Sequence, residues 1–236
     1  GASLSGEIAK LYGNYGLKKN PITLRLSGTA GQSLGAWNAD GLNIQLTGDA
    51  NDYVGKGMAG GEISISTPEK LASKADKMVI IGNTCLYGAT GGHLFANGIA
   101  GERFAVRNSG CTSVVEGTGH HACEYMTGGT IVVLGDTGSN FGAGMTGGLA
   151  FIYDKEKQFD KNANTLSVDY NSLNKKSLNK HKEYLRSLLE KHFKLTNSLK
   201  CKKILDNFDT EAKCFIVVKP ISSNFDELLS QITSAA

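Results

Sequence analysis

The segment HHACEY gathers four side chains that commonly bind metals or transfer protons. His120, His121, Cys123 and Glu124 are all chemically able to coordinate a metal ion. Successive side chains of an extended strand point to opposite faces, so His121 and Cys123 could share a face that His120 and Glu124 would not readily join. A packed or hydrogen-bonded corner is therefore the favoured interpretation, and a metal site is the alternative.

The segment GDANDY holds the nearest approach to a pair of catalytic carboxylates. Asp49 and Asp52 could bind calcium, or act as acid and base as in β-helical enzymes that cleave polysaccharides. Aspartate also caps turns, and no matching acidic cluster recurs on either side of this segment. We therefore expect Asp49 and Asp52 to cap turns.

Three charged residues flank the apolar run RFAV at residue 103, which we expect to form a strand. Arg103 and Arg107 lie four residues apart and would point the same way, with Glu102 beside them. Salt bridges that brace the coil or a partner domain are the expected role, and a catalytic arginine is the less favoured alternative. No serine, histidine and acid lie at nucleophile-elbow spacing, so we predict no catalytic residues.

A G-x-x-G-G motif recurs in the first half of the chain, and it resembles parts of phosphate-binding loops. Such a loop joins one strand to one helix N-terminus, whereas here strands follow a repeated motif. We therefore predict turns and no cofactor site. The expected structural turn glycines are Gly57, Gly60, Gly61, Gly88, Gly91, Gly92, Gly128, Gly129, Gly144, Gly147 and Gly148.

Short apolar runs recur with these turns, often at intervals of 16 to 20 residues. Some alternate apolar and polar residues, as half-buried strands do, and others are continuously apolar, as strands covered on both sides are. No helical pattern separates them, which indicates stacked coils, a parallel β-helix, over residues 22–154. The runs are ITLRL at 22, LNIQL at 42, EISIS at 62, MVII at 78, RFAV at 103, TSVV at 112, TIVVL at 130 and LAFIY at 149.

The chain divides where its composition changes. All 30 glycines lie at or before Gly148. We expect a short capping helix within residues 1–21, a polar linker over 155–178 with one last strand near Leu166 and Val168, and a mostly helical tail over 179–236. Within the tail we predict two helices, HKEYLRSLLEKHFKL and LKCKKILDNF, and Ser198 is the expected N-cap of the second. We then predict a strand, KCFIVVKP, and a final helix, FDELLSQI.

Composition limits the classes of function. A net charge of +3 does not favour nucleic-acid binding, and its excess lies in the tail, where a solvated helical face explains it. No apolar run reaches the roughly 20 residues that cross a bilayer, and the first residues do not form a signal peptide. The five cysteines contain no C-x-x-C pair, so neither disulfides nor a zinc ribbon is indicated. We expect an intracellular, cytoplasmic protein with free thiols.

Several long stretches resemble the C-terminal domain of the glutamate synthase large subunit. They are GTAGQSLGAW, GDANDYVGKGMAGGEISI, IIGNTCLYGATGGHLFANGIAGERFAVRNSG and VVEGTGHHACEYMTGGTIVVLGDTGSNFGAGMTGGLAFIYD. The likeness covers residues 3 to about 154, and the helical tail is similar more loosely. A subunit of formylmethanofuran dehydrogenase shares the glycine-rich repeat in weaker form.

The resemblance implies a right-handed β-helix in an enzyme that makes two glutamates from glutamine and 2-oxoglutarate. In that family an N-terminal cysteine releases ammonia from glutamine, and a separate barrel holds FMN and an iron–sulfur cluster. His120, where an acidic residue is commoner, and Cys111, where a small residue is usual, depart from the family pattern. No cofactor is expected in this chain; FMN and the cluster are expected in partner domains.

The leading hypothesis is a non-catalytic structural domain or subunit of a glutamate synthase. Its expected partners are the amidotransferase and synthase domains, with no nucleic acid and no membrane. Two alternatives stay open: an independent β-helical polysaccharide lyase or hydrolase, and a scaffold subunit of another oxidoreductase such as formylmethanofuran dehydrogenase.

Overall fold

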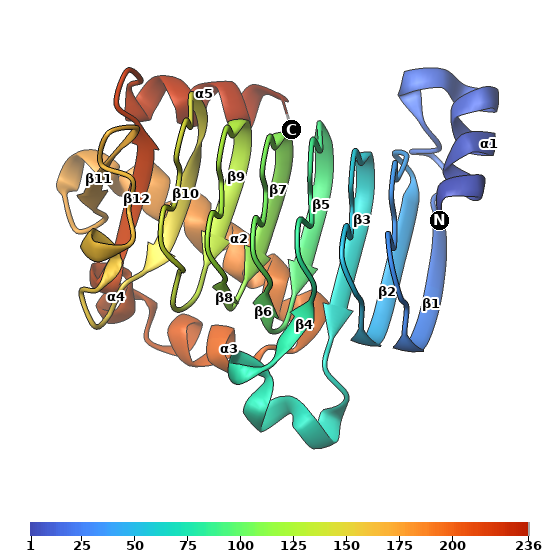
Figure 1. Ribbon diagram of the computed structural model, residues 1–236, viewed down its shortest axis with the longest axis horizontal. Helices are drawn as coiled ribbons and strands as arrows, with labels where there is room; N and C mark the ends of the chain where they lie inside the picture. The colour runs from blue at the N-terminus through green and yellow to red at the C-terminus, as the bar shows by residue number, and fades with distance from the viewer. Residues whose placement is uncertain (236) are drawn as a thin grey trace.

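A computed structural model describes residues 1–235 of the chain, which form a β-solenoid followed by a helical tail (Figure 1). The solenoid part contains α1 (Ala2–Tyr12), η1 (Gly13–Tyr15), β1 (Ile22–Thr29), β2 (Leu42–Asp49), β3 (Ala59–Ser66), η2 (Glu69–Lys77), β4 (Val79–Ile81), β5 (Gly91–Ala96), β6 (Ile99–Ala100), β7 (Ser109–Val115), β8 (Gly117–Thr118), β9 (Thr127–Val133) and β10 (Gly147–Tyr153).

The remaining elements complete the sheet and cover one face of it. They are η3 (Phe159–Lys161), β11 (Val168–Ser172), η4 (Lys176–Leu178), α2 (Asn179–Thr196), α3 (Leu199–Asp206), α4 (Phe208–Glu211), η5 (Ala212–Cys214), β12 (Phe215–Pro220) and α5 (Phe225–Ala235). The four predicted tail elements are confirmed, including Ser198, whose side chain accepts a hydrogen bond from Cys201 N. Residues 155–178, expected as a linker with one last strand near Leu166 and Val168, contain that strand as β11, which begins at Val168.

The strands form two sheets that run along the solenoid. The larger has the order β1-β2-β3-β5-β7-β9-β10-β12-β11, and its first seven strands pair in parallel. The smaller contains β4, β6 and β8. Equivalent residues of successive coils therefore stack in columns, such as Leu24, Ile44, Ile63 and Leu94. The predicted fold class, a solenoid of parallel strands with a helical tail, is confirmed.

The alternation of side chains separates two apolar clusters. On β9, Ile131 and Val133 point into the solenoid, whereas Val132 packs with the tail helices. On β10, Ala150 and Phe151 divide in the same way. Strands covered on both faces thus carry the continuously apolar runs, as predicted, because each side chain enters one core or the other. β5, which the sequence reading missed, belongs to this covered group.

Each coil turns through a corner whose backbone alternates between right-handed and left-handed conformations. The first, third and fifth residues of all six corners have positive φ. We call the stack of these segments the corner ladder; it comprises residues 33–37, 53–57, 84–88, 103–107, 121–125 and 140–144. Backbone hydrogen bonds join neighbouring corners, such as Arg103 N to His120 O at 2.8 Å and Cys123 N to Phe104 O at 2.8 Å.

The corner ladder overturns one strand prediction. RFAV was expected to be extended, but Arg103, Ala105 and Arg107 have φ between 56° and 59°. Three left-handed residues at alternate positions cannot belong to a β-strand. Phe104, Ala105 and Val106 are nevertheless buried, so the apolar run reflects burial at a corner.

The glycine pairs begin strands where successive coils come closest. A Cβ atom on Gly91 would lie 2.6 Å from the carbonyl oxygen of Ala59 in the preceding coil, so no larger residue fits. The next residue, Gly92, has φ of +83°, which side chains disfavour. The register of β3 with β5 shifts at this point. The first glycine of the pair thus permits close approach and the second permits the turn.

The tail is joined to the solenoid by buried polar groups as well as by apolar packing. Ser198, at the start of α3, donates a hydrogen bond to Glu116, which follows β7 and is buried. His192 of α2 is also fully buried; its Nε2 lies 3.9 Å from Glu116 Oε1. Neither ring nitrogen has a hydrogen-bond partner among residues 1–235. The hydroxyl of Ser198 and the N-terminus of α3 stabilise the buried negative charge of Glu116. The buried imidazole of His192 has no hydrogen bond of this kind.

We expect Gly91→Ala to lower the free energy of unfolding by at least about 2 kcal/mol, since the new methyl group must displace backbone atoms. Gly6→Ala is the matched control, because a Cβ there meets nothing within 4 Å and the site lies in α1. The control should gain up to about 1 kcal/mol. Urea unfolding followed by circular dichroism measures both, and equal stabilities would contradict this account of the glycine pairs.

His192 should make stability depend on pH. Burial lowers the pKa of His192, and Glu116 opposes that shift only in part. The folded state therefore keeps the ring neutral while the unfolded state binds a proton near pH 6.5, so the free energy of unfolding falls as pH decreases through that value. From pH 7.5 to 5.5 this one group should remove at most about 1.4 kcal/mol, the limit for a ring that stays neutral in the folded state.

Both His192→Leu and His192→Gln remove the titrating ring. Leucine puts no polar atom in its place, whereas glutamine keeps a polar side chain at this buried position. Urea unfolding at the two pH values should show that both variants lose this contribution. Variants whose stability falls with pH as steeply as that of the unmodified chain would show that His192 is not its source.

Candidate functional site

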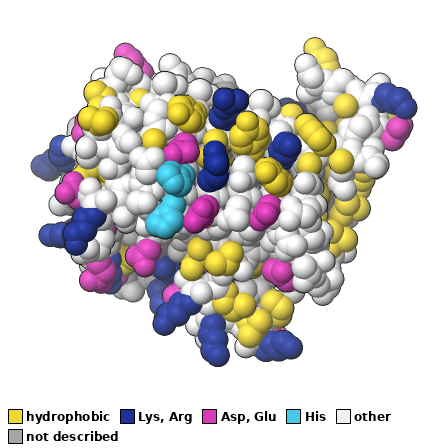
Figure 2. Space-filling model, in the orientation of Figure 1, with side chains coloured by type: hydrophobic (Ala, Val, Ile, Leu, Met, Phe, Trp, Pro, Cys, Tyr) yellow, Lys and Arg dark blue, Asp and Glu magenta, His cyan; other side chains and the backbone are white. Residues whose placement is uncertain are grey.

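The corner ladder presents the chain's most chemically varied surface. Its outward positions carry Trp37 and Tyr125, which are 62% and 59% exposed, together with exposed Tyr53, Arg103 and Arg107. Figure 2 shows two histidines side by side on one face, with acidic, basic and apolar groups around them. The third residue of each corner points inward instead, as fully buried Cys123 does.

The ring orientations follow from packing against the next coil. Trp37 lies against Gly57, where a Cβ would come within 2.9 Å of the indole, and Tyr125 lies against Gly144 in the same manner. Glycine at the fifth position of one corner therefore makes room for the aromatic ring of its neighbour. These rings are exposed to solvent on one side and supported by protein on the other.

The histidine pair is embedded in a hydrogen-bonded network, and the strand-based expectation for it was wrong. Cys123 turns into the core, while Glu124 Oε1 lies 2.8 Å from His121 Nδ1 and accepts a hydrogen bond from Asn140 at 3.0 Å. His120 Nδ1 accepts one from Ser139 N at 3.0 Å. The expected hydrogen-bonded corner is present, with Glu124 and not Cys123 as the partner of His121.

A carboxylate-oriented imidazole is a component of many general bases, but a base also needs a substrate pocket and a reacting partner. Neither His120 nor His121 lines the crevice described below. Among residues 1–235, no group of three or more histidine, cysteine or acidic side chains is placed to hold a metal ion.

The other charged candidates act within the turns or face solvent. Asp52 Oδ1 accepts a hydrogen bond from Asn83 N at 2.7 Å, and Asp49 Oδ1 accepts one from Thr29 Oγ1 at 2.9 Å. Asp52 therefore caps a backbone amide of the next coil, as expected, whereas Asp49 bonds a threonine side chain of the preceding strand. Arg103 and Arg107 are exposed, and neither forms an ion pair or hydrogen bond with its side chain in the described part of the chain. The expected internal salt bridges are absent from this part of the molecule.

The glycine turns do not offer a phosphate-binding loop. The amide of Gly57 donates to Tyr87 O at 2.8 Å, and that of Gly88 donates to Val106 O at 3.1 Å. A phosphate cradle needs several unpaired amides directed at one point. These amides are already engaged between coils, so they do not fit the phosphate of a flavin nucleotide.

All five thiols are free; four are buried, and Cys214 is partly exposed. Burial raises the pKa of Cys85 to about 12 and raises the pKa values of Cys111, Cys123 and Cys201 further. A buried neutral thiol is a poor nucleophile and a poor metal ligand. Because an iron–sulfur cluster requires several converging thiolates, these cysteines do not fit one.

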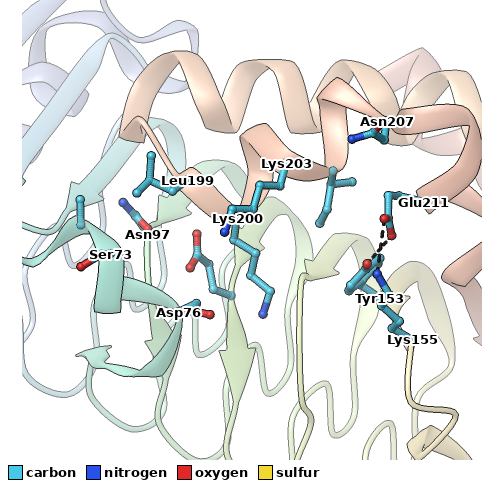
Figure 3. Close-up of a pocket in the computed structure, with 13 residues that line it drawn as sticks. Ser73, Asp76, Asn97, Tyr153, Lys155, Leu199, Lys200, Lys203, Asn207 and Glu211 are labelled. Atoms are coloured by element: carbon cyan, nitrogen blue, oxygen red, sulfur yellow. Dashed lines mark hydrogen bonds and ion pairs between the residues drawn. The ribbon is translucent and has the colours of Figure 1, made fainter.

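A crevice of about 540 Å³ lies between the solenoid and the tail, bordered by η2, α3 and α4 (Figure 3). Buried Asn97 and Glu116 line it, together with Lys200 and Lys203 of α3. Asn97 Nδ2 donates to Thr196 O at 3.3 Å, but its Oδ1 has no partner in the described residues. At the other end Tyr153 donates to Glu211, which also pairs with Lys155.

A buried cluster adjoins the crevice through Glu116, and sequence reasoning missed its contacts because Glu116 meets a residue 82 positions later. Ser198, Glu116 and His192 lie together, as the members of a catalytic triad do. The serine, however, donates to the carboxylate and accepts from Cys201 N, and the imidazole is fully buried. The geometry needed for nucleophile activation, with a histidine between serine and acid, is absent from this cluster.

Comparison with known proteins accounts for nearly the whole chain. The model of a family described as "GXGXG motif" matches residues 1–221. The ferredoxin-dependent glutamate synthase of Pyropia yezoensis is 54% identical over 228 residues, the NADH glutamate synthase of Schizosaccharomyces pombe 48% over 220, and the NADPH glutamate synthase large chain of Bacillus subtilis 46% over 233.

These matches cover 93–98% of this chain but only 10–15% of the length of those relatives. The similarity therefore concerns one part of much larger proteins. Among the described residues, no helix combines the length and the apolar character that a membrane span requires. The chain belongs to the GXGXG family, and the part that it shares with glutamate synthases is nearly its whole length, the glycine-rich solenoid together with most of the helical tail.

Proposed function

We propose that the chain is a non-catalytic structural domain or subunit of a glutamate synthase, the enzyme that converts glutamine and 2-oxoglutarate to two glutamates. The observation that carries the proposal is its identity of 46–54% to glutamate synthases over nearly its whole length. The local chemistry agrees with it, since Asp49, Asp52 and glycine amides of the solenoid link neighbouring coils, and the thiols of the solenoid are buried.

The fold is suited to fixing a distance between other domains. Parallel strands stack about 4.8 Å apart, so seven coils make a rod on the order of 30 Å long. Main-chain ladders in both sheets and in the corners resist its extension or bending. A domain of this kind would hold an amidotransferase part and an FMN- and iron–sulfur-containing synthase part in a constant arrangement, while those parts supply the cofactors and the chemistry.

No observation favours the alternatives. A polysaccharide lyase or hydrolase would need Asp49 and Asp52 directed at a substrate, and both instead accept hydrogen bonds from neighbouring coils. A scaffold role in formylmethanofuran dehydrogenase rests on the weaker resemblance alone.

We further propose a cytoplasmic location, because free buried thiols fit a reducing compartment.

The scaffold role can be tested in the complete glutamate synthase with Gly91→Ala and its control Gly6→Ala. Distorting the solenoid should lower glutamine-dependent glutamate formation, which needs ammonia to pass between two catalytic parts. Glutamine hydrolysis and ammonia-dependent glutamate formation, measured separately, should change much less, because each uses one part only.

The control should resemble the unmodified enzyme in all three assays. A loss of either partial reaction as large as the loss of the coupled reaction would point to a direct chemical contribution from this domain. An unchanged coupled rate in a verified, destabilised Gly91→Ala enzyme would remove the scaffold proposal.

A further inference from the structure

The outer surface of the solenoid is covered unequally by the chain itself. Helix α2 packs across β3, β5 and β7, and α5 packs against β9 and β10, so the outer face of the large sheet is occupied over these five strands, whereas β1 stays largely exposed. The corner ladder receives no such cover over Trp37, Tyr53 and Tyr125, whose rings remain exposed. Figure 2 shows apolar and charged groups intermixed across a broad face.

The residue types on the corner ladder are those that concentrate binding energy at protein interfaces. Tryptophan, tyrosine and arginine are enriched at such hot spots. Trp37 is the single tryptophan of the chain, and it is 62% exposed. Sixteen of the 30 ladder residues are exposed or partly exposed, so the ladder could form the centre of an interface to which one partner contributes roughly 20–30 residues.

The ladder is organised before any partner arrives. Trp37 and Tyr125 rest on Gly57 and Gly144 of the adjacent coils, and the Lys56 ammonium lies 5.2 Å from the centre of the Tyr53 ring. The corner backbones are linked by hydrogen bonds. Little conformational freedom is therefore lost when this surface is covered, which favours tight association.

Charge indicates the chemistry of the partner. Arg103 and Arg107 lack ionic partners among residues 1–235, whereas Glu124 is engaged by His121 and Asn140, and Asp52 by Asn83. Glu102, just outside the ladder, is exposed and also unpaired here, but within the ladder Lys56, Arg103 and Arg107 outnumber the one carboxylate, Glu124. A surface that combines carboxylates with apolar groups would complement two free guanidinium groups and three aromatic rings.

We propose that the corner ladder is the face that docks onto another part of the glutamate synthase large chain, through a surface rich in carboxylates and apolar groups. The inference rests on the proposed function and names the surface through which that function would act. The partner is inferred from the length of the relatives. The match covers only 10–15% of their sequences, so the rest of each protein is a much larger body for this domain to contact.

Photo-crosslinking in the complete, active glutamate synthase tests this assignment. Tyr125→p-benzoylphenylalanine places the probe on the ladder, and Tyr15→p-benzoylphenylalanine is the matched control, since Tyr15 lies in η1 outside the ladder and is 87% exposed. Mass spectrometry should identify peptides of the amidotransferase or synthase part joined to position 125. The yield should exceed that at position 15 at least about fivefold.

A second arm tests the charges. Arg103→Glu combined with Arg107→Glu should reduce the cross-link at position 125 at least about fivefold, because like charges would then face each other. Lys194→Glu, an exposed change on α2, should not. A yield at position 125 no higher than at position 15, insensitivity to charge reversal, or cross-links only to a second copy of this domain would overturn the assignment.

The same preparation is assayed for glutamine-dependent glutamate formation before irradiation. If the assembly that contains this chain lacks that activity, the proposed function fails. If the assembly is active but position 125 does not reach its other parts, only the choice of surface fails.

Discussion

The structure depends on one constraint: each coil must satisfy the backbone hydrogen bonds of the coils before and after it. In the strands this is ordinary parallel pairing. At the corners it requires alternate left-handed residues, because only then do successive amides reach carbonyls of both neighbours, as Arg103 N and Cys123 N do. A left-handed conformation costs about 1 kcal/mol or more for a residue with a side chain, and the ladder of hydrogen bonds offsets that cost.

The same constraint explains where sequence reasoning succeeded and where it failed. Strand recurrence and the glycine pairs predicted stacked coils, because both arise from local repetition. The corner residues His121, Cys123, Arg103 and Arg107 could not be placed correctly. Residues that alternate between right-handed and left-handed backbone conformations produce a burial pattern that resembles that of a strand. In addition, Thr84, Leu86 and Ala105 adopt positive φ although none of them is a glycine, so the sequence does not indicate the turn. Only the neighbouring coils enforce that conformation.

The crevice at the tail was unpredictable for a different reason. Glu116 belongs to the solenoid and Ser198 to a helix 82 positions later, and nothing in either local sequence indicates that they meet. Conversely, the N-cap role of Ser198 was evident from its local context. Long-range polar contacts thus escape a reading of the sequence even where every element is correctly predicted, and here they join apolar packing and the pairing of β10 with β12 in fastening the tail to the solenoid.

The reversal of strand direction at the end of the large sheet has a further consequence. β12 runs antiparallel to β10, and β11 antiparallel to β12. A stack of parallel coils with an open end could template another molecule and grow into a fibre. Here the edge strand is the five-residue β11, which is shorter than the eight-residue β1 and belongs to no complete coil, so the first coil of a second molecule meets no equivalent coil on which to stack. The pair of β11 and β12, which come from distant parts of the chain, therefore caps the solenoid at this end and opposes its growth into a fibre.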